Sequence, residues 1–85
     1  MTGKGTVTFW PNPATDRFFL SSNQSSREPV LLTVTDVGGR EVLSRWLNFS
    51  EESVIQTDIS SLTSGVYAVT LFGSFANQHF RLIKP

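Results

Sequence analysis

Hydrophobic and polar residues alternate along most of the chain, so that apolar positions recur with a period of two. This pattern predicts seven short strands, at residues 7–9, 17–22, 30–37, 41–47, 54–59, 66–72 and 78–84. The third and sixth strands each have one clearly apolar face, formed by Val30, Leu32 and Val34 and by Tyr67, Val69 and Leu71. Turn residues separate the strands, and no stretch has a helical period. The sequence therefore predicts an all-β fold, a seven-stranded immunoglobulin-like antiparallel β-sandwich.

A chain of 85 residues is expected to form one domain with a single core. It has no cysteine, so neither disulfides nor thiolate metal sites reinforce that core, and the hydrophobic 39% of the residues must supply it. We expect the domain to span residues 6–85. The polar, glycine-rich residues 1–5 are expected to be a linker or to derive from an expression vector, and the amino terminus lacks the apolar run of a secretory signal.

The formal net charge is zero, from seven basic and seven acidic residues. A surface that follows nucleic-acid phosphates needs clustered Lys and Arg, so we expect no nucleic-acid partner. No stretch approaches the length of a membrane span.

Three aspartates, Asp16, Asp36 and Asp58, stand at strand ends beside turns. They are interpreted as caps of backbone N–H groups rather than as catalytic carboxylates or calcium ligands. The Gly38–Gly39 pair is expected to supply the positive φ angles of a tight hairpin. Arg40 beside it is expected to be exposed at one end of the sandwich, because burying an unpaired guanidinium is costly.

The residues available for catalysis are few. His79 is the single histidine and is interpreted as an outward, solvated strand residue. No serine stands in a Gly-x-Ser-x-Gly elbow, and no base–nucleophile pair or metal-ligand motif is found. We therefore expect no enzyme activity, no catalytic residue, no cofactor and no metal. Trp10, Trp46 and Tyr67 offer an alternative, a carbohydrate-binding platform, although core or edge packing is favoured for the two tryptophans.

Three ordered segments carry a family resemblance. Residues 10–16 read WPNPATD, residues 34–42 read VTDVGGREV, and residues 58–67 read DISSLTSGVY, before a closing strand that ends in Lys84 and Pro85. They resemble the Y-P-N-P-A-x-D, hydrophobic-x-D-x-x-G-R-x-V and D-x-S-x-L-x-x-G-x-Y motifs of the C-terminal sorting domain of the type IX secretion system of Bacteroidota. Trp10 stands where tyrosine is commoner, and Pro85 where the family favours lysine or an apolar residue. The resemblance assigns recognition to Pro11, Asn12, Pro13, Asp16, Asp36, Gly39, Arg40, Asp58, Leu62, Gly65, Tyr67, Arg81 and Lys84.

The resemblance also implies a function. Such a domain folds in the periplasm at the end of a cargo protein and docks on the outer-membrane translocon. A sortase then cleaves ahead of it and attaches the cargo to lipopolysaccharide, so the protein ends at the cell surface or is secreted. An uncleaved docking module of the same family is the alternative fate.

The last strand has two interpretations of equal weight: a partner reads its edge by β-augmentation, or it only completes its sheet. An exposed edge also allows an edge-strand dimer. Deletion of residues 81–85 is expected to block export while leaving the sandwich folded.

Overall fold

The computed structural model describes residues 7–22, 28–49, 54–73 and 77–85; the predicted leader, residues 1–5, lies outside the described residues. All seven predicted strands are present. They are β1 (Val7–Trp10), β2 (Arg17–Ser22), β3 (Val30–Thr35), β4 (Glu41–Leu47), β5 (Val54–Asp58), β6 (Gly65–Phe72) and β7 (Asn77–Lys84). β3 is two residues shorter than predicted, because Asp36 already begins a turn.

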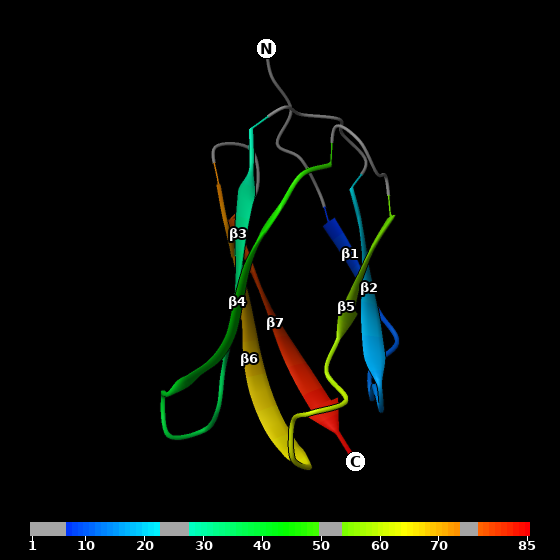
Figure 1. Cartoon of the computed structure of the whole chain (residues 1–85), viewed down its shortest axis with the longest axis vertical. Helices are drawn as coiled ribbons and strands as arrows, with labels where there is room; N and C mark the ends of the chain where they lie inside the picture. The colour runs from blue at the N-terminus through cyan, green and yellow to red at the C-terminus, as the bar shows by residue number, and fades with distance from the viewer. Residues whose placement is uncertain (1–6, 23–27, 50–53, 74–76) are drawn as a thin grey trace.

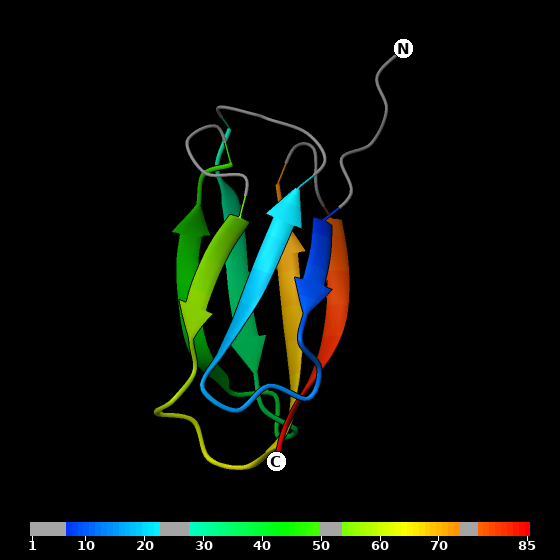
Figure 2. The same ribbon diagram turned by 90° about the vertical axis from the view of Figure 1, so that its right-hand side faces the viewer.

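The strands form two antiparallel sheets that pack face to face (Figures 1 and 2). One sheet has the order β1-β2-β5 and the other the order β4-β3-β6-β7. In constant-type immunoglobulin domains the fourth strand belongs to the sheet of the first, second and fifth strands, whereas here β4 pairs with β3 in the larger sheet. The predicted all-β sandwich is confirmed, with the fourth strand in the C-F-G type sheet.

The core lies between the inner faces of the two sheets. Both predicted apolar faces are buried: the β3 residues are fully inaccessible, and Tyr67 is 6% exposed. Phe9 of β1 packs edge-to-face on Phe18 of β2 and stacks on Phe80 of β7, with both ring centroids 4.9 Å away. This aromatic cluster joins the two sheets and contributes much of the apolar area that a domain without disulfides must bury.

Side chains close both open sides of the sandwich. On one side the Gln78 amide receives a hydrogen bond from Val7 N (2.8 Å) and donates one to Val7 O (3.3 Å), which joins β7 to β1. On the other side Arg45 of β4 donates from Nη1 to Gln56 O of β5 (3.0 Å). An inward-pointing charge on an edge strand also opposes pairing with a second sheet.

The sandwich has two distinct ends (Figures 1 and 2). The chain enters the described fold at one of them, where β1 begins. At the opposite end lie the β1–β2 loop, the β3–β4 hairpin, the β5–β6 loop and the carboxyl terminus. We call this opposite end, formed by residues 11–16, 36–40, 58–67 and 84–85, the motif end, because the three sequence motifs meet there.

Candidate functional site

The first motif attaches the β1–β2 loop to the outer edge of β7. Asn12 donates from Nδ2 to Arg81 O (2.6 Å) and accepts from Ile83 N at Oδ1 (3.0 Å). Two residues later, Ala14 N donates to Ile83 O (3.0 Å), and the Ala14 side chain is buried. The flanking Pro11 and Pro13 are exposed, and the peptide bond before each is cis. Residues 12–14 therefore lie along the edge of β7, held there by two side-chain hydrogen bonds of Asn12 and one backbone hydrogen bond of Ala14.

The same loop is joined to the third motif through Asp16. The main-chain carbonyl of Asp16 accepts a hydrogen bond from Ile59 N (2.8 Å). Among the described residues the Asp16 carboxylate makes no capping bond, so the capping prediction is wrong for Asp16. The backbone already fixes this loop, which leaves the side chain to solvent.

The second motif forms the β3–β4 hairpin, whose turn is organised by Asp36. Asp36 Oδ1 accepts from Gly38 N and from Arg40 N, both at 2.9 Å, as predicted for a cap. Gly39 N donates to Asp36 O (2.9 Å), and Asp36 N donates to Arg40 O (2.9 Å). Of the two hairpin glycines only Gly39 has a positive φ, +85°, so the prediction of positive φ at both is wrong for Gly38. The loop between β3 and β4 starts with an ordinary β-turn over residues 36–39. In this turn only the last residue, Gly39, has a left-handed conformation.

Arg40 is exposed at this hairpin, as predicted. Its side chain is 81% accessible, and Nε lies 3.6 Å from Asp36 Oδ2. An ion pair this exposed contributes little to stability. Arg40 thus presents an exposed guanidinium that a partner can contact.

The third motif builds the β5–β6 loop from short local contacts. Asp58 Oδ1 accepts from Ser60 N (2.8 Å), as predicted for a cap. Hydrogen bonds from the Ser60 backbone and side chain, with smaller effects of Arg17 and Lys84, hold the pKa of Asp58 below its ordinary value, against an opposing effect of desolvation. Leu62 N donates to Ile59 O (3.0 Å), and the half-buried Leu62 side chain packs on the core.

Tyr67 closes this loop from the next strand. Its hydroxyl donates to Thr63 O (2.6 Å), four residues upstream, while its ring packs in the core. This geometry is the tyrosine corner of immunoglobulin-like domains, at the corresponding corner before the sixth strand. Gly65, which begins β6 with a φ of +156°, gives the chain the bend between the loop and the strand.

Lys84 connects the last strand to the third motif. Its Nζ donates to Ile59 O (2.7 Å), Ser60 O (3.3 Å) and Leu62 O. Ser64 Oγ adds a hydrogen bond to Pro85 O (2.9 Å). An ammonium group has three donors and no acceptor, so three carbonyls satisfy it. Lys84 is therefore a clasp inside the motif end rather than a free cation.

Seven of the thirteen predicted recognition residues fall into two groups, according to what their polar side chains contact. Asn12, Asp36, Asp58, Tyr67 and Lys84 use their polar groups to hold the motif end together. Arg40 and Arg81 are exposed. Arg81 lies on β7, three residues before Lys84, and pairs with Ala68 of β6. β7 is an edge strand, as the augmentation hypothesis requires, but residues 12–14 occupy its edge groups at Arg81 and Ile83.

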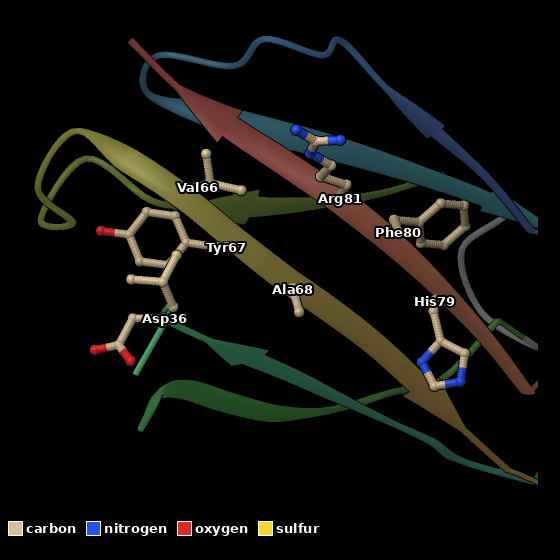
Figure 3. A pocket seen from close by; sticks show the side chains of 8 residues that line it. Asp36, Val66, Tyr67, Ala68, His79, Phe80 and Arg81 are labelled. Carbon is tan, nitrogen blue, oxygen red and sulfur yellow. The ribbon is translucent and has the colours of Figure 1, made fainter. Parts of the chain in front are cut away.

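A hollow of about 430 Å³ lies beside the motif end, on the outer face of β6 and β7 (Figure 3). Its lining includes Val66 and Ala68 of β6, His79 and Arg81 of β7, and Asp36 and Val37 of the hairpin. The sequence alone did not single out Val37, Val66 or Ala68 as surface-site residues. Two sequence features could have indicated this surface: an apolar residue at the tip of a hairpin, and apolar residues at the outward positions of a strand.

The aromatic residues do not form the carbohydrate platform. Tyr67 is buried, Trp10 lies in the three-stranded sheet and Trp46 in the four-stranded sheet. Trp10 stacks on Phe19 at a centroid distance of 5.7 Å, in line with edge packing. Trp46 is 64% exposed on the edge strand β4, so core packing is wrong for this residue. Without a shared surface for the three rings, the carbohydrate-binding alternative loses its basis.

His79 is exposed on β7, as predicted. In the described part of the chain, no three His, Cys, Asp or Glu side chains gather as metal ligands would. Over the same residues, the fold holds no apolar helix of the length needed to span a bilayer.

Comparison with known proteins decides the family. A family model for the secretion system C-terminal sorting domain matches residues 8–84, which include all seven strands except for Val7. The chain belongs to this family. It is therefore a sorting domain of the type IX secretion system, a family that is not one of enzymes. The search of curated proteins finds no significant match.

The tyrosine corner of the sorting domain gives a first prediction. Tyr67→Phe removes the donor to Thr63 O and leaves the ring in the core, so we expect a loss of about 1 kcal/mol of unfolding free energy. For a domain of this size the midpoint of thermal unfolding falls by roughly 4–8 °C. Circular dichroism measures that midpoint. Thr63→Ala is the comparison variant: it removes the longer contact of Thr63 Oγ1 with the same hydroxyl (3.3 Å) but keeps the carbonyl acceptor, so it is expected to lower the midpoint less. Equal midpoints for Tyr67→Phe and the unmodified domain would contradict the proposed corner.

Proposed function

We propose that this domain is the disposable sorting signal of a cargo protein. In this proposal residues 6–85 are the C-terminal part of a precursor that reaches the periplasm, folds there and docks on the outer-membrane translocon. A sortase then cleaves ahead of β1 and attaches the cargo at the cell surface. The domain itself has no catalytic role and needs no cofactor. The family match over residues 8–84 is the observation that carries this function.

The shape of the domain supports the proposal. β1 begins at one end of the sandwich, and the three motifs and the carboxyl terminus lie at the other (Figure 2). A cargo attached before β1 therefore leaves the motif end accessible. We assign the exposed Arg40 and Arg81 to contact with the machinery, and the internally bonded motif residues to keeping that end in shape.

A reporter fusion tests this function. Residues 5–85, with an upstream linker, are fused to a fluorescent or enzymatic reporter and expressed in a bacterium that has the type IX machinery. We expect the reporter at the cell surface, measured by protease accessibility on intact cells. The same fusion in a strain without the translocon is the control and is expected to stay in the periplasm.

Retention in the periplasm of the first strain would refute the sorting function. Mass spectrometry of the surface fraction separates the two fates of the domain. Loss of the peptides of β6 and β7 from the mature surface protein supports cleavage. Their persistence would instead support the uncleaved docking module.

A further inference from the structure

Resting on the proposed sorting function, we propose that the hollow on the outer face of β6 and β7 is the surface that the export machinery binds. The partner is a protein segment with an apolar side chain next to an Asp or Glu, whose carboxylate pairs with Arg81. The apolar side chain fills the hollow between Val37 and Val66.

The edge of β7 is less suited to this contact. Three of its backbone groups, Arg81 O, Ile83 N and Ile83 O, are bonded to Asn12 and Ala14. A strand that added itself to this edge would have to displace the first motif and break these bonds. The contact surface near the carboxyl terminus is therefore a face of the sheet rather than its edge.

The outer face of β6 and β7 beside the motif end carries exposed apolar side chains that do not pack in the core. Val37 at the hairpin tip is 87% exposed, Val66 39% and Ile83 37%. Val66 lies opposite Ile83, and Ala68 lies opposite Arg81, so these side chains share one face of the β6–β7 pair. Apolar side chains gathered around a hollow, with polar groups at its rim, are typical of a protein-binding surface.

The charges around the hollow identify the partner. The Asp36 carboxylate is already bonded, through Oδ1 to the hairpin N–H groups and through Oδ2 to Arg40. The Arg81 side chain has no hydrogen bond or ion pair with any described residue, so it is the unmatched charge at this rim (Figure 3). A guanidinium forms two parallel hydrogen bonds with a carboxylate, which favours an acidic residue in the partner.

A second apolar row on the same sheet carries no such argument. Trp46, Leu31 and Phe72 lie side by side across β4, β3 and β6, with Asn77 next to Phe72. This row lies toward the end where β1 begins, and the strand positions in it offer no charged group to select a partner.

Charge substitutions in the reporter fusion test the proposed surface. Val66→Asp places a carboxylate in the hollow, and Arg81→Glu repels the partner's acidic residue. Each is expected to lower the surface-exposed reporter by about tenfold or more, because an unpaired charge buried at an interface, or two like charges brought together there, weakens binding by more than that factor. Val54→Asp is the matched control. Val54 is also an exposed strand valine (47%), lies on β5 of the other sheet, and its substitution is expected to leave export within about twofold.

Thermal unfolding and reporter export are measured separately for each variant, so that a loss of folding is not mistaken for a loss of binding. Thermal unfolding of each variant chain is expected to stay within a few degrees of the unmodified chain, since these side chains are exposed. If Val66→Asp does not fold, Val37→Asp replaces it, because Val37 stands at the hairpin tip outside the core. Export of the unmodified fusion together with normal export of the folded Arg81 and valine variants would overturn this inference alone. Failure of the unmodified fusion would overturn the proposed function instead.

Discussion

Deletion of residues 81–85 is expected to unfold the whole sandwich. The segment contains Leu82, whose side chain is fully inaccessible, and truncating such a leucine to alanine alone costs about 2–5 kcal/mol. It also removes the Lys84 clasp and half of the pairing of β7 with β6. A small domain has a total stability on the order of 5–15 kcal/mol, so the combined loss leaves little or none. The structure therefore argues against our sequence-based expectation that the truncated sandwich stays folded.

Near-ultraviolet circular dichroism and thermal unfolding of the truncated chain measure this effect. Removal of Pro85 alone is the control. It takes away one exposed hydrogen bond, from Ser64 Oγ, and is expected to leave the unfolding transition nearly unchanged. A truncated chain that still unfolded cooperatively near the original midpoint would show that the last strand is dispensable for folding. Loss of export in the long truncation is thus no proof of terminal recognition.

Lys84→Met is expected to destabilise the domain by about 2 kcal/mol. Methionine keeps the length and apolar stem of the side chain but leaves three carbonyls of the β5–β6 loop without their ammonium donor. For a domain of this size the thermal midpoint then falls by about 8–16 °C. Calorimetry or circular dichroism of the purified chain measures the shift.

Arg40→Met is the matched control for this substitution. Arg40 is a cation at the same end, but its side chain is 81% exposed and its ion pair with Asp36 is long. Its replacement is expected to change stability by less than about 0.5 kcal/mol. Equal losses from the two substitutions would mean that Lys84 contributes only general charge, and the clasp would have to be abandoned.

The sequence was sufficient to predict the fold and its strands. The buried faces of β3 and β6 follow from a period of two, because alternate strand residues point to the same side. Arg40 and His79 are exposed as predicted, since solvation of charged and polar groups is a local property of the residue. The turns at Asp36 and Asp58 were equally readable, because an aspartate caps N–H groups only two to four residues away.

The arrangement of the motif end was not predictable in this way. Asn12 bonds to β7 across 69 and 71 residues of sequence, and Lys84 bonds to a loop 22–25 residues upstream. Such contacts depend on which strands become neighbours, and no local pattern records that. The exposure of Trp46 was missed for a related reason, since it depends on β4 being an edge strand.

Most polar residues of the three motifs therefore serve to hold one end of the sandwich together. The first motif covers the edge of β7, and the second caps the β3–β4 hairpin. The backbone carbonyls of the third motif accept hydrogen bonds from the Lys84 ammonium group. Arg40 at this end, with Arg81 and the hollow on the outer face of β6 and β7 beside it, remains exposed and forms the surface that we propose for contact with the export machinery.

Amide hydrogen exchange tests most directly whether the motifs lock this end together. Ala14, Ile59 and Leu62 lie in loops, where amides usually exchange fast, yet each donates to a backbone carbonyl of the motif end. We predict that these amides exchange at least about 100-fold more slowly than those of an unstructured peptide, while the amide of Val37 at the hairpin tip exchanges freely. If the amides of Ala14, Ile59 and Leu62 exchanged as fast as that of Val37 in the folded domain, the result would contradict the account.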